Sequence, residues 1–465
     1  MSGPDDRPLR VMKFGGSSVG DSERMAATAA IIKQHAGDSR LVVVVSAMEG
    51  VTASLLRAAG AASRRETETW QQIGAELRAR HLRVCTTLVP DRDRQGILAR
   101  IDSAMDTLQD YCAGFSLVRE LTPRSLDALS SLGEVLAAAL LAATLRAGGL
   151  AAEAVDATEL IVTDDSFGNA ALVFEPTQVK VGSRLGPLLE RGAIPVVTGF
   201  RAAARDGSFT TLGRGGSDYS ATILGAALPA REIWIWTDVA GVMTADPRLV
   251  PGARVIPQLS YREAIELSFF GAKVLHPKSL DLPARAGIPV LIKNSFEPDA
   301  PGTEVGGSRP RNPGVRAIAS TAQAALFTVS ADRSVAFTRL ATLVFGWLDA
   351  DRVSTLVVTQ SSAENVLSFA VNSGEAAGVR RRLDRELGRS LAAVEELDQV
   401  GVVVAVGEGM KGTPGIAARI FSSIARLGIN VAAIAQGSSE LSVSLVVRAT
   451  DVEASVRAMH QEFGL

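Results

Sequence analysis

The chain has 465 residues, of which 47% are hydrophobic and 21% are charged, and its formal net charge is −2. This length exceeds one ordinary hydrophobic core, so two or three domains are expected. The charges balance and form no basic block. That balance argues against nucleic acid and against an anionic membrane as partners.

The termini and the rare residues bear on the compartment. The segment MSGPDDRPLR is polar, and the longest apolar helical stretch, from Val135, is shorter than the roughly 20 residues that a spanning helix needs. Cys85 and Cys112 form no CxxC pair, which predicts a reducing cytoplasm and no disulfide framework. The dispersed histidines predict surface or helix-cap positions, and no metal site built by the protein alone is expected.

Apolar runs alternate with helical segments as far as about residue 295. The runs are apolar almost continuously, as in strands buried on both faces of a parallel sheet. Predicted strands lie within Leu9–Ser18, from Arg40, and within Ala193–Phe200, Glu232–Val242 and Gly287–Ser295; predicted helices include Ser22–His35, Ser125–Ala147 and Asp218–Leu228. This alternation indicates a doubly wound α/β domain.

In such a sheet, ligands bind beyond the carboxyl ends of the strands. Here those ends carry small and polar residues: Gly15-Gly16-Ser17, Ser46, Thr198-Gly199 and Thr237-Asp238. We therefore expect these residues to converge on one crevice.

The first strand ends in KFGGSS, in which Lys13 precedes paired glycines. Glycines let backbone N–H groups approach a phosphate, and a lysine at a strand end can place its ammonium over the β and γ oxygens. This order differs from the P-loop motif, whose lysine follows its glycines. The alternative is a tight turn with a solvated lysine.

The segment TTLGRGGSDYSAT, Thr210–Thr222, joins glycines, an arginine and an acid at a predicted helix start. Ser217 or Asp218 is expected to cap that helix. Arg214 lies in the loop, where its guanidinium could grip a carboxylate through two hydrogen bonds. The alternative is a plain glycine loop with an N-cap, but the combination favours a binding site.

Glu134 lies in a predicted helix that is apolar on nearly all sides, with no lysine or arginine within one turn. A buried carboxylate is costly unless it is paired. One interpretation is that Ser130 and Ser131 mark an exposed face. The other is that the partner of Glu134 arrives with the substrate, as an ammonium group.

Two later segments would each pass as an ordinary loop. They are WTDVAGVMTADPR, Trp236–Arg248, and FGAKVLHPKSL, Phe270–Leu280. Taken with Lys13, they add the cation of Lys273 and a loop suited to framing a base or ribose.

Proline, glycine and charge concentrate after Glu297, which indicates a linker. Beyond it, LVVTQSSAENVLSFAV (Leu356–Val371) matches AAIAQGSSELSVSLVV (Ala432–Val447), so a module is repeated. We expect a catalytic domain at 1–297, a linker at 298–315 and two small α+β modules at 316–398 and 399–465. The second module could share the strand near 315–322.

These segments together resemble the aspartate kinases (aspartokinases) of the amino acid kinase family over essentially the whole chain. The matching motifs lie at Lys13–Ser18, Ser46–Thr52, Gly133-Glu134, Thr211–Asp218, Thr237–Gly241 and Phe270–Pro277. The resemblance implies an αβα sandwich with a mainly parallel sheet, followed by two ACT modules of ferredoxin-like βαββαβ fold. It implies a cytoplasmic kinase that uses ATP and Mg²⁺ to convert L-aspartate to 4-phospho-L-aspartate, the first step toward lysine, threonine and methionine.

The resemblance also implies residue roles. The nucleotide would be bound by Lys13, Phe14, Gly15, Gly16, Thr237, Asp238, Met243, Arg248, Lys273 and Val274. Aspartate would be held by Thr52, Glu134 and Arg214, with Ser46 and Ser217 nearby. Asp218 would lie by the γ-phosphate and organise Lys13 and Mg²⁺, so Lys13, Arg214 and Asp218 are the catalytic candidates.

Three features depart from the family pattern. Met243 stands where relatives often have a tyrosine beside the nucleotide. The first repeat reads VSADRSVAFTRLA where the second has the glycine loop VGEGMKGTPGIAA, so one effector loop looks eroded. No strand–GxGxxG unit follows, so the homoserine dehydrogenase activity of some relatives is expected to be absent.

The strand ends with glutamine and serines predict threonine in preference to lysine as effector, at a site centred on Gln436 and Asn430, with Gln360 as its counterpart. Pairing of ACT modules predicts a homodimer or homotetramer. Two alternative functions stay open: a sister kinase for another acidic substrate, and a catalytically inactive amino-acid sensor. Glu134 argues against acetylglutamate, whose nitrogen is acylated, and the intact Lys13, Arg214 and Asp218 argue against the sensor.

Overall fold

The computed structural model describes residues 7–270, 275–307, 314–332, 334–361 and 363–465, apart from the side chains of 388–391. The chain divides into two compact units. One comprises Met1–Gly241 with Val274–Gly307, and the other comprises Val242–Lys273 with Ser308–Leu465. The segment Val242–Lys273, which lies inside the predicted catalytic domain, thus groups with the C-terminal region, and the predicted domain boundaries stay a prediction.

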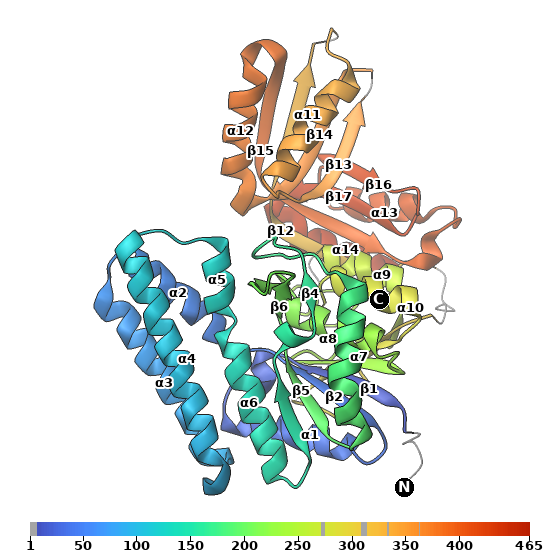
Figure 1. Ribbon diagram of the computed structural model, residues 1–465. Coiled ribbons are helices and arrows are strands. Elements are labelled where there is room, and N and C mark those ends of the chain that lie inside the picture. Colours follow the sequence, from blue (N-terminus) through green and yellow to red (C-terminus); the bar gives the residue numbers. More distant parts are fainter. Residues whose placement is uncertain (1–6, 271–274, 308–313, 333, 362) are drawn as a thin grey trace. The chain divides into compact units, whose positions relative to one another are not determined.

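One sheet dominates the first unit (Figure 1). The strands of this sheet that belong to the first unit lie in the order β3 (Ala152–Val155), β5 (Ile194–Thr198), β2 (Arg40–Val45), β1 (Leu9–Phe14), β8 (Glu232–Thr237), β10 (Val290–Asn294) and β11 (Thr303–Val305). Neighbours are parallel except β10 and β11, which are antiparallel. The apolar runs of β1, β2, β5 and β8 are almost wholly buried, so the predicted mainly parallel sheet is confirmed.

Helices cover both faces of this sheet or pack on the helices that do. They are α1 (Ser22–His35), α2 (Val51–Ser63), α3 (Thr67–Leu88), α4 (Asp91–Val118), α5 (Pro123–Ser130), α6 (Leu132–Ala147), α7 (Phe174–Glu190), α8 (Gly216–Ala227) and α10 (Lys278–Ala286). Met12 and Phe14 of β1 belong to the core that α1 to α4 and α6 share. Val11 faces α8, close to Gly225. Because side chains alternate along a strand, Lys13 points to the α8 face, where the site forms.

Two smaller features complete this unit. The strands β4 (Val162–Thr163), β6 (Arg201–Ala204) and β7 (Phe209–Thr211) form a separate sheet in that order. The helices α3 and α4 run side by side as a long hairpin (Figure 1).

The helical run Pro123–Ala147, which contains α5 and α6, is long and apolar enough to cross a membrane by length and composition. The prediction from Val135 onward underestimated this length. However, 89% of the most apolar window is buried inside the protein, as in a core helix.

The second unit contains a six-stranded antiparallel sheet in the order β13 (Thr355–Ser361), β14 (Val366–Asn372), β12 (Ala317–Ala331), β15 (Ala392–Val406), β17 (Ser442–Arg448) and β16 (Ala433–Gln436). Its helices are α9 (Tyr261–Phe269), α11 (Phe337–Ala350), α12 (Ser373–Leu391), α13 (Ile416–Ala425) and α14 (Val452–Phe463), and β9 (Gln258–Leu259) precedes α9. This arrangement confirms the predicted α+β region after the kinase sheet.

The two repeats share their central strands. β12 and β15 have 15 residues each, and they pair with each other along almost their whole lengths. One half of β12 also pairs with β14, and the opposite half of β15 pairs with β17. The predicted boundary between residues 398 and 399 therefore falls inside β15.

The prediction of surface or helix-cap histidines is wrong for two of them. His81 of α3 is fully buried, and its Nδ1 lies 2.7 Å from the carbonyl oxygen of Leu77. His460 is buried too, with Nε2 2.9 Å from Oγ1 of Thr244. Both histidines lie on the buried faces of their helices, α3 and α14, which dispersion along the sequence could not reveal.

Candidate active site

The loops after three parallel strands meet, as the sequence predicts. The backbone N–H of Gly15 donates to Trp236 O, that of Ser46 to Phe14 O and that of Gly199 to Val45 O, over 3.1, 3.1 and 2.9 Å. Each bond ties the residue that follows one strand to the end of its neighbour. A cavity of about 360 Å³ opens beside these loops, entirely within the first unit.

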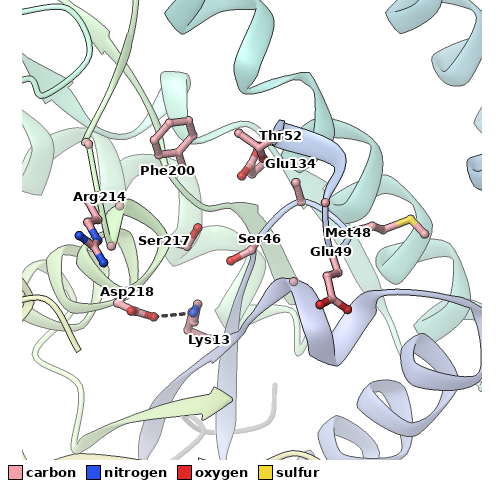
Figure 2. Close-up of a pocket in the computed structure, with 16 residues that line it drawn as sticks. Lys13, Ser46, Met48, Glu49, Thr52, Glu134, Phe200, Arg214, Ser217 and Asp218 are labelled. Carbon is pink, nitrogen blue, oxygen red and sulfur yellow. Dashed lines mark ion pairs between the residues drawn. The ribbon is translucent and has the colours of Figure 1, made fainter. Parts of the chain in front are cut away.

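Figure 2 shows the residues that line this cavity. Eight of the residues predicted from the sequence are among them: Lys13, Gly16, Ser46, Thr52, Glu134, Arg214, Ser217 and Asp218. They come from β1, the loop after β2, α2, α6, the loop after β7 and α8. The structure thus brings together the residues predicted for phosphate and for aspartate, while their roles stay predictions.

Lys13 and Asp218 form an ion pair on one side of the cavity (Figure 2). The distance from Nζ to Oδ1 is 2.5 Å, and the two side chains are 10% and 12% exposed. β1 positions the lysine, and the first turn of α8 positions the aspartate. Anionic groups are favourable at a helix N-terminus, so the same turn can also receive a phosphate.

The glycine loop before α8 ends differently from the prediction. Gly215 is the N-cap, and no side chain caps the helix, so the predicted Ser217 or Asp218 cap is wrong. Gly215 has φ +71°, and a Cβ there would lie 2.5 Å from Cβ of His276, so only glycine fits. Ser217 and Asp218 are therefore inside the helix, with their side chains available to the cavity.

Arg214 lies on the exposed loop between these glycines. Within the described part of the chain it forms no ion pair with a carboxylate. Its guanidinium is thus free to bind a carboxylate from solution with two hydrogen bonds.

Glu134 lies in the first turn of α6 and is only 3% exposed, so the interpretation of an exposed face is wrong. Its Oε2 is buried and has no hydrogen-bond partner among the described residues. Burial raises the pKa of this carboxyl to about 7, while the backbone of Ala47 and the charge of Arg201 act in the opposite direction. A buried acceptor without a partner is costly, and a ligand with a donor would relieve that cost.

Close packing holds Glu134 in this position. A Cβ on Gly133 would lie 2.6 Å from Cβ of Ala47 and 2.8 Å from a methyl group of Val51. The missing side chain lets α6 approach the loop that carries Ser46 and the start of α2, where Thr52 lies. This close approach explains why a glycine directly precedes Glu134.

Other predicted nucleotide residues lie outside the cavity lining. Phe14 is buried and stacks on Trp236 with ring centroids 5.8 Å apart. Thr237 Oγ1 donates to Asp238 Oδ1 over 3.2 Å at the end of β8. Met243 and Arg248 belong to the second unit, where Arg248 pairs with Asp246 at 2.6 Å. Lys273 and Val274 lie outside the described residues.

The predicted effector residues are exposed in the second unit. Gln360 and Gln436 lie on the outer strands β13 and β16, and Asn430 precedes β16. In the first repeat, Nδ2 of Asn365 donates to the carbonyl oxygens of Ala331, Asp332 and Val335. In the second repeat, the N–H of Gly412 donates to the Glu440 carboxylate.

Sequence reasoning missed three residues around the cavity. Phe200 lines it with φ +66°, an unusual conformation for an aromatic residue that no sequence pattern signals. Glu49 also lines it, in the stretch between Ser46 and Thr52, and its place inside a predicted motif was a usable signal. Arg201 is buried at 4% exposure directly after Phe200.

The described residues contain no cluster of three or more His, Cys, Asp or Glu side chains that could hold a metal ion. The cavity nevertheless offers the carboxylates of Glu49 and Asp218. Mg²⁺ is commonly bound through one or two carboxylates together with substrate phosphates. The residues present therefore fit a Mg²⁺ ion that is held jointly with a nucleotide.

The amino acid kinase family model matches residues 8–294, and an ACT domain model matches residues 403–463. Aspartokinase 2, chloroplastic, of Arabidopsis thaliana is 35% identical over 97% of this chain and 84% of its own length. The bifunctional aspartokinase/homoserine dehydrogenase of Haemophilus influenzae is 33% identical over 97% of this chain. The chain spans only about half the length of such bifunctional relatives, 56% of that protein and 50% of one from Zea mays.

Solved structures give the same assignment as the sequence comparisons. E. coli aspartokinase III in complex with aspartate and ADP (R-state) superimposes with a TM-score of 0.84 and 28% identity, covering 98% of this chain and all of that one. The same enzyme in complex with lysine and aspartate (T-state) gives a TM-score of 0.78. The chain therefore belongs to the amino acid kinase family, and within it to the aspartokinases.

Proposed function

We propose that this protein transfers the γ-phosphoryl group of ATP to the side-chain carboxylate of L-aspartate, giving 4-phospho-L-aspartate and ADP. The observation that carries the proposal is the buried Glu134, which lines the same cavity as Arg214 and the Lys13–Asp218 pair and whose Oε2 has no hydrogen-bond partner in the part of the chain that the structure describes. A site for a cation at Glu134, a site for a carboxylate at Arg214 and a phosphate region at Lys13 match an amino acid acceptor.

Each group of aspartate has a complementary group in this cavity. The α-ammonium would pair with Glu134, and the α-carboxylate would bind the guanidinium of Arg214. The side-chain carboxylate would then face Lys13 and the N-terminus of α8, where the phosphoryl group arrives. It is already ionised at neutral pH, so its attack needs no general base.

Catalysis would rest on position and charge. Phosphoryl transfer requires little covalent participation by the protein, so alignment of acceptor and phosphate supplies most of the acceleration. Lys13 would stabilise charge on the phosphoryl oxygens, and Asp218 would orient Lys13. Mg²⁺, when bound with the phosphates beside Asp218, would neutralise phosphate charge.

Two solved structures of a relative support aspartate and ATP as the substrates. E. coli aspartokinase III binds aspartate and ADP in one structure, and lysine and aspartate in another. The lysine complex of this relative supports regulation of this chain by an amino acid effector through its ACT region. We further infer that threonine is preferred over lysine, because of the glutamines and serines at the strand ends, and that the protein acts as a homodimer or homotetramer. Buried free thiols of Cys85 and Cys112 support a reducing compartment, which we propose is the cytoplasm.

The test is a hydroxamate assay, in which hydroxylamine traps acyl phosphate formed from aspartate and MgATP. Product that depends on both aspartate and ATP is expected. Acetylglutamate in place of aspartate tests the sister-kinase alternative, since its acylated nitrogen offers Glu134 no cation. An effector-binding protein that forms no hydroxamate with either acid would be the inactive sensor.

A further inference from the structure

Arg201 is a buried cation that none of the predicted roles uses. It begins β6, directly after the cavity residue Phe200, and is 4% exposed. Its Nε donates to Asp156 Oδ1 over 3.1 Å, and its Nη2 lies 3.1 Å from Asp156 Oδ2. This two-pronged contact joins the start of β6 to the residue that follows β3.

The remaining nitrogen of the same guanidinium, Nη1, reaches the residue before α6. Nη1 of Arg201 donates to Oγ of Ser131 over 2.8 Å, and that hydroxyl in turn donates to the carbonyl oxygen of Asp127 over 2.8 Å. Ser131 immediately precedes α6, and Glu134 lies in the first turn of that helix. One side chain therefore connects the segment of Phe200, the end of β3 and the N-terminus of α6.

Arg201 acts on the cavity only through other residues. It is not among the residues that line the cavity, whose charged members are Lys13, Glu49, Glu134, Arg214 and Asp218. Its charge nevertheless favours the ionised form of Glu134, against the effect of burial. The ionised form is the one that an ammonium group requires.

We propose that Arg201 is the positioning residue of the ammonium subsite: it fixes the first turn of α6, and with it the carboxylate of Glu134, relative to Phe200. The inference rests on the proposed function, because it assumes that Glu134 receives the substrate's ammonium group. According to this proposal, the preference for an amino acid over a plain dicarboxylic acid depends partly on Arg201, which does not contact the substrate.

Arginine is required here because of its shape. Its planar guanidinium contacts Asp156 on one edge and Ser131 on another, which the single ammonium of lysine cannot do. Loss of the arginine does not strand Asp156, since Oδ1 also accepts from the N–H of Thr158 and from Oγ1 of Thr198. Substitution should therefore affect the site more than the fold.

The test compares aspartate with succinate, which is aspartate without its ammonium group. Dissociation constants for both would be measured by calorimetry on the full chain, for the parent protein and for Arg201→Met, Arg201→Lys and Ser131→Ala. Ser131→Ala removes the short hydroxyl contact with Arg201 and the bond of that hydroxyl to Asp127 O, and it leaves the longer bond of 3.4 Å from Arg201 Nη1 to the Ser131 carbonyl oxygen. Thr144→Val is the matched control, because its buried hydroxyl donates to Leu140 O farther along the same helix.

We expect the preference for aspartate over succinate to fall about tenfold in both Arg201 variants, since a displaced group loses its alignment with the ligand. Ser131→Ala should lower it in the same direction, and Thr144→Val should leave it unchanged. The KM for ATP should stay within about twofold in all of them.

Two results would overturn the inference: equal weakening of aspartate and succinate, or an unchanged preference in both Arg201→Met and Ser131→Ala. If Arg201→Met does not fold, Ser131→Ala decides alone. A parent protein that binds succinate as tightly as aspartate would instead remove the ammonium role of Glu134, and with it the basis of the proposed function.

Discussion

Nζ of Lys13 lies 2.5 Å from Oδ1 of Asp218, although the two residues come from the first strand and from a helix that begins at Gly216. Both side chains are largely shielded from water. The aspartate holds the ammonium of Lys13 in one orientation beside the glycine loop. This pair therefore defines where a phosphoryl group would be received.

Lys13→Ala is expected to lower kcat at least about a hundredfold, because charge on the phosphoryl oxygens loses its cation. Steady-state kinetics with the hydroxamate readout measure this effect. Lys33→Ala is the control, since Lys33 is an exposed lysine of α1. A Lys13 variant that keeps tens of per cent of the parent kcat would give Lys13 a structural role only.

Asp218→Asn should also lower kcat and should change the dependence of activity on Mg²⁺ concentration. The substitution keeps the size of the side chain but removes the charge that faces Lys13. Activity titrated with Mg²⁺ at fixed ATP provides the measurement. An unchanged metal profile contradicts the proposed role of Asp218.

Arg214→Ala should raise the KM for aspartate and leave the KM for ATP nearly unchanged. The loss of a carboxylate's charged partner typically costs ~2–5 kcal/mol of binding free energy. The KM for ATP serves as an internal control in the same experiment. Equal weakening of both substrates would argue that Arg214 shapes the loop as a whole.

Glu134 makes the affinity for aspartate depend on pH. Its pKa is raised from 4.5 to about 7 by burial, so in the ligand-free protein the carboxyl becomes protonated as the pH falls below about 7. The protonated form cannot pair with an ammonium group. We expect the KM for aspartate to rise as the pH falls from 8 to 6, and to do so much less in Glu134→Gln, which binds aspartate weakly throughout.

The raised pKa of Glu134 also predicts that the ionised carboxylate, which binds aspartate, lowers the stability of the aspartate-free protein. A raised pKa means that the folded state prefers the protonated carboxyl, so stability is lost as the pH rises from about 4.5 through about 7. Glu134→Gln should therefore stabilise the aspartate-free protein at pH 8 by up to about 3 kcal/mol, and by little at pH 4. Thermal unfolding at both pH values measures this, and a variant less stable than the parent at pH 8 would contradict it.

Feedback is predicted to be weak or limited to one site, with threonine more effective than lysine. An effector's carboxylate needs backbone N–H groups, which the glycine loop Gly407–Gly415 of the second repeat can supply. In the first repeat, Asp332 occupies the corresponding loop, and its carboxylate accepts from the N–H of Ser334 over 2.8 Å. Kinase activity titrated with threonine, lysine and both is the measurement. Strong cooperative inhibition by lysine alone, or threonine inhibition that survives Gln436→Ala, would refute this prediction.

The sequence predicted the parts of the site that follow from strand geometry. Parallel strands end at one edge of a sheet, so the residues after Lys13, Ser46 and Gly199 could be expected to meet. Glu134 was recognisable because a lone acid in an apolar helix needs an explanation. These inferences needed only local patterns and one rule of topology.

Features that depend on distant partners could not be predicted in this way. Arg201 reads as an ordinary strand residue until Asp156 and Ser131 are seen beside it. Phe200 takes a left-handed conformation with φ +66°, which no local sequence pattern indicates. The start of α8 at Gly216 was missed because close packing against His276 selected glycine over a capping side chain.

The shared strands β12 and β15 couple the two repeats mechanically. A strand of 15 residues spans about 50 Å, and here two such strands are bonded to each other along almost their entire lengths. Register shifts interrupt the pairing only between Thr321 and Leu326. The glycine loop of the second repeat begins at Gly407, directly after β15. A displacement of this loop would therefore be transmitted along the paired strands to their other end, which belongs to the first repeat. A repeat that binds no effector could still change its conformation when the other repeat binds one. The two repeats should also unfold in a single thermal transition.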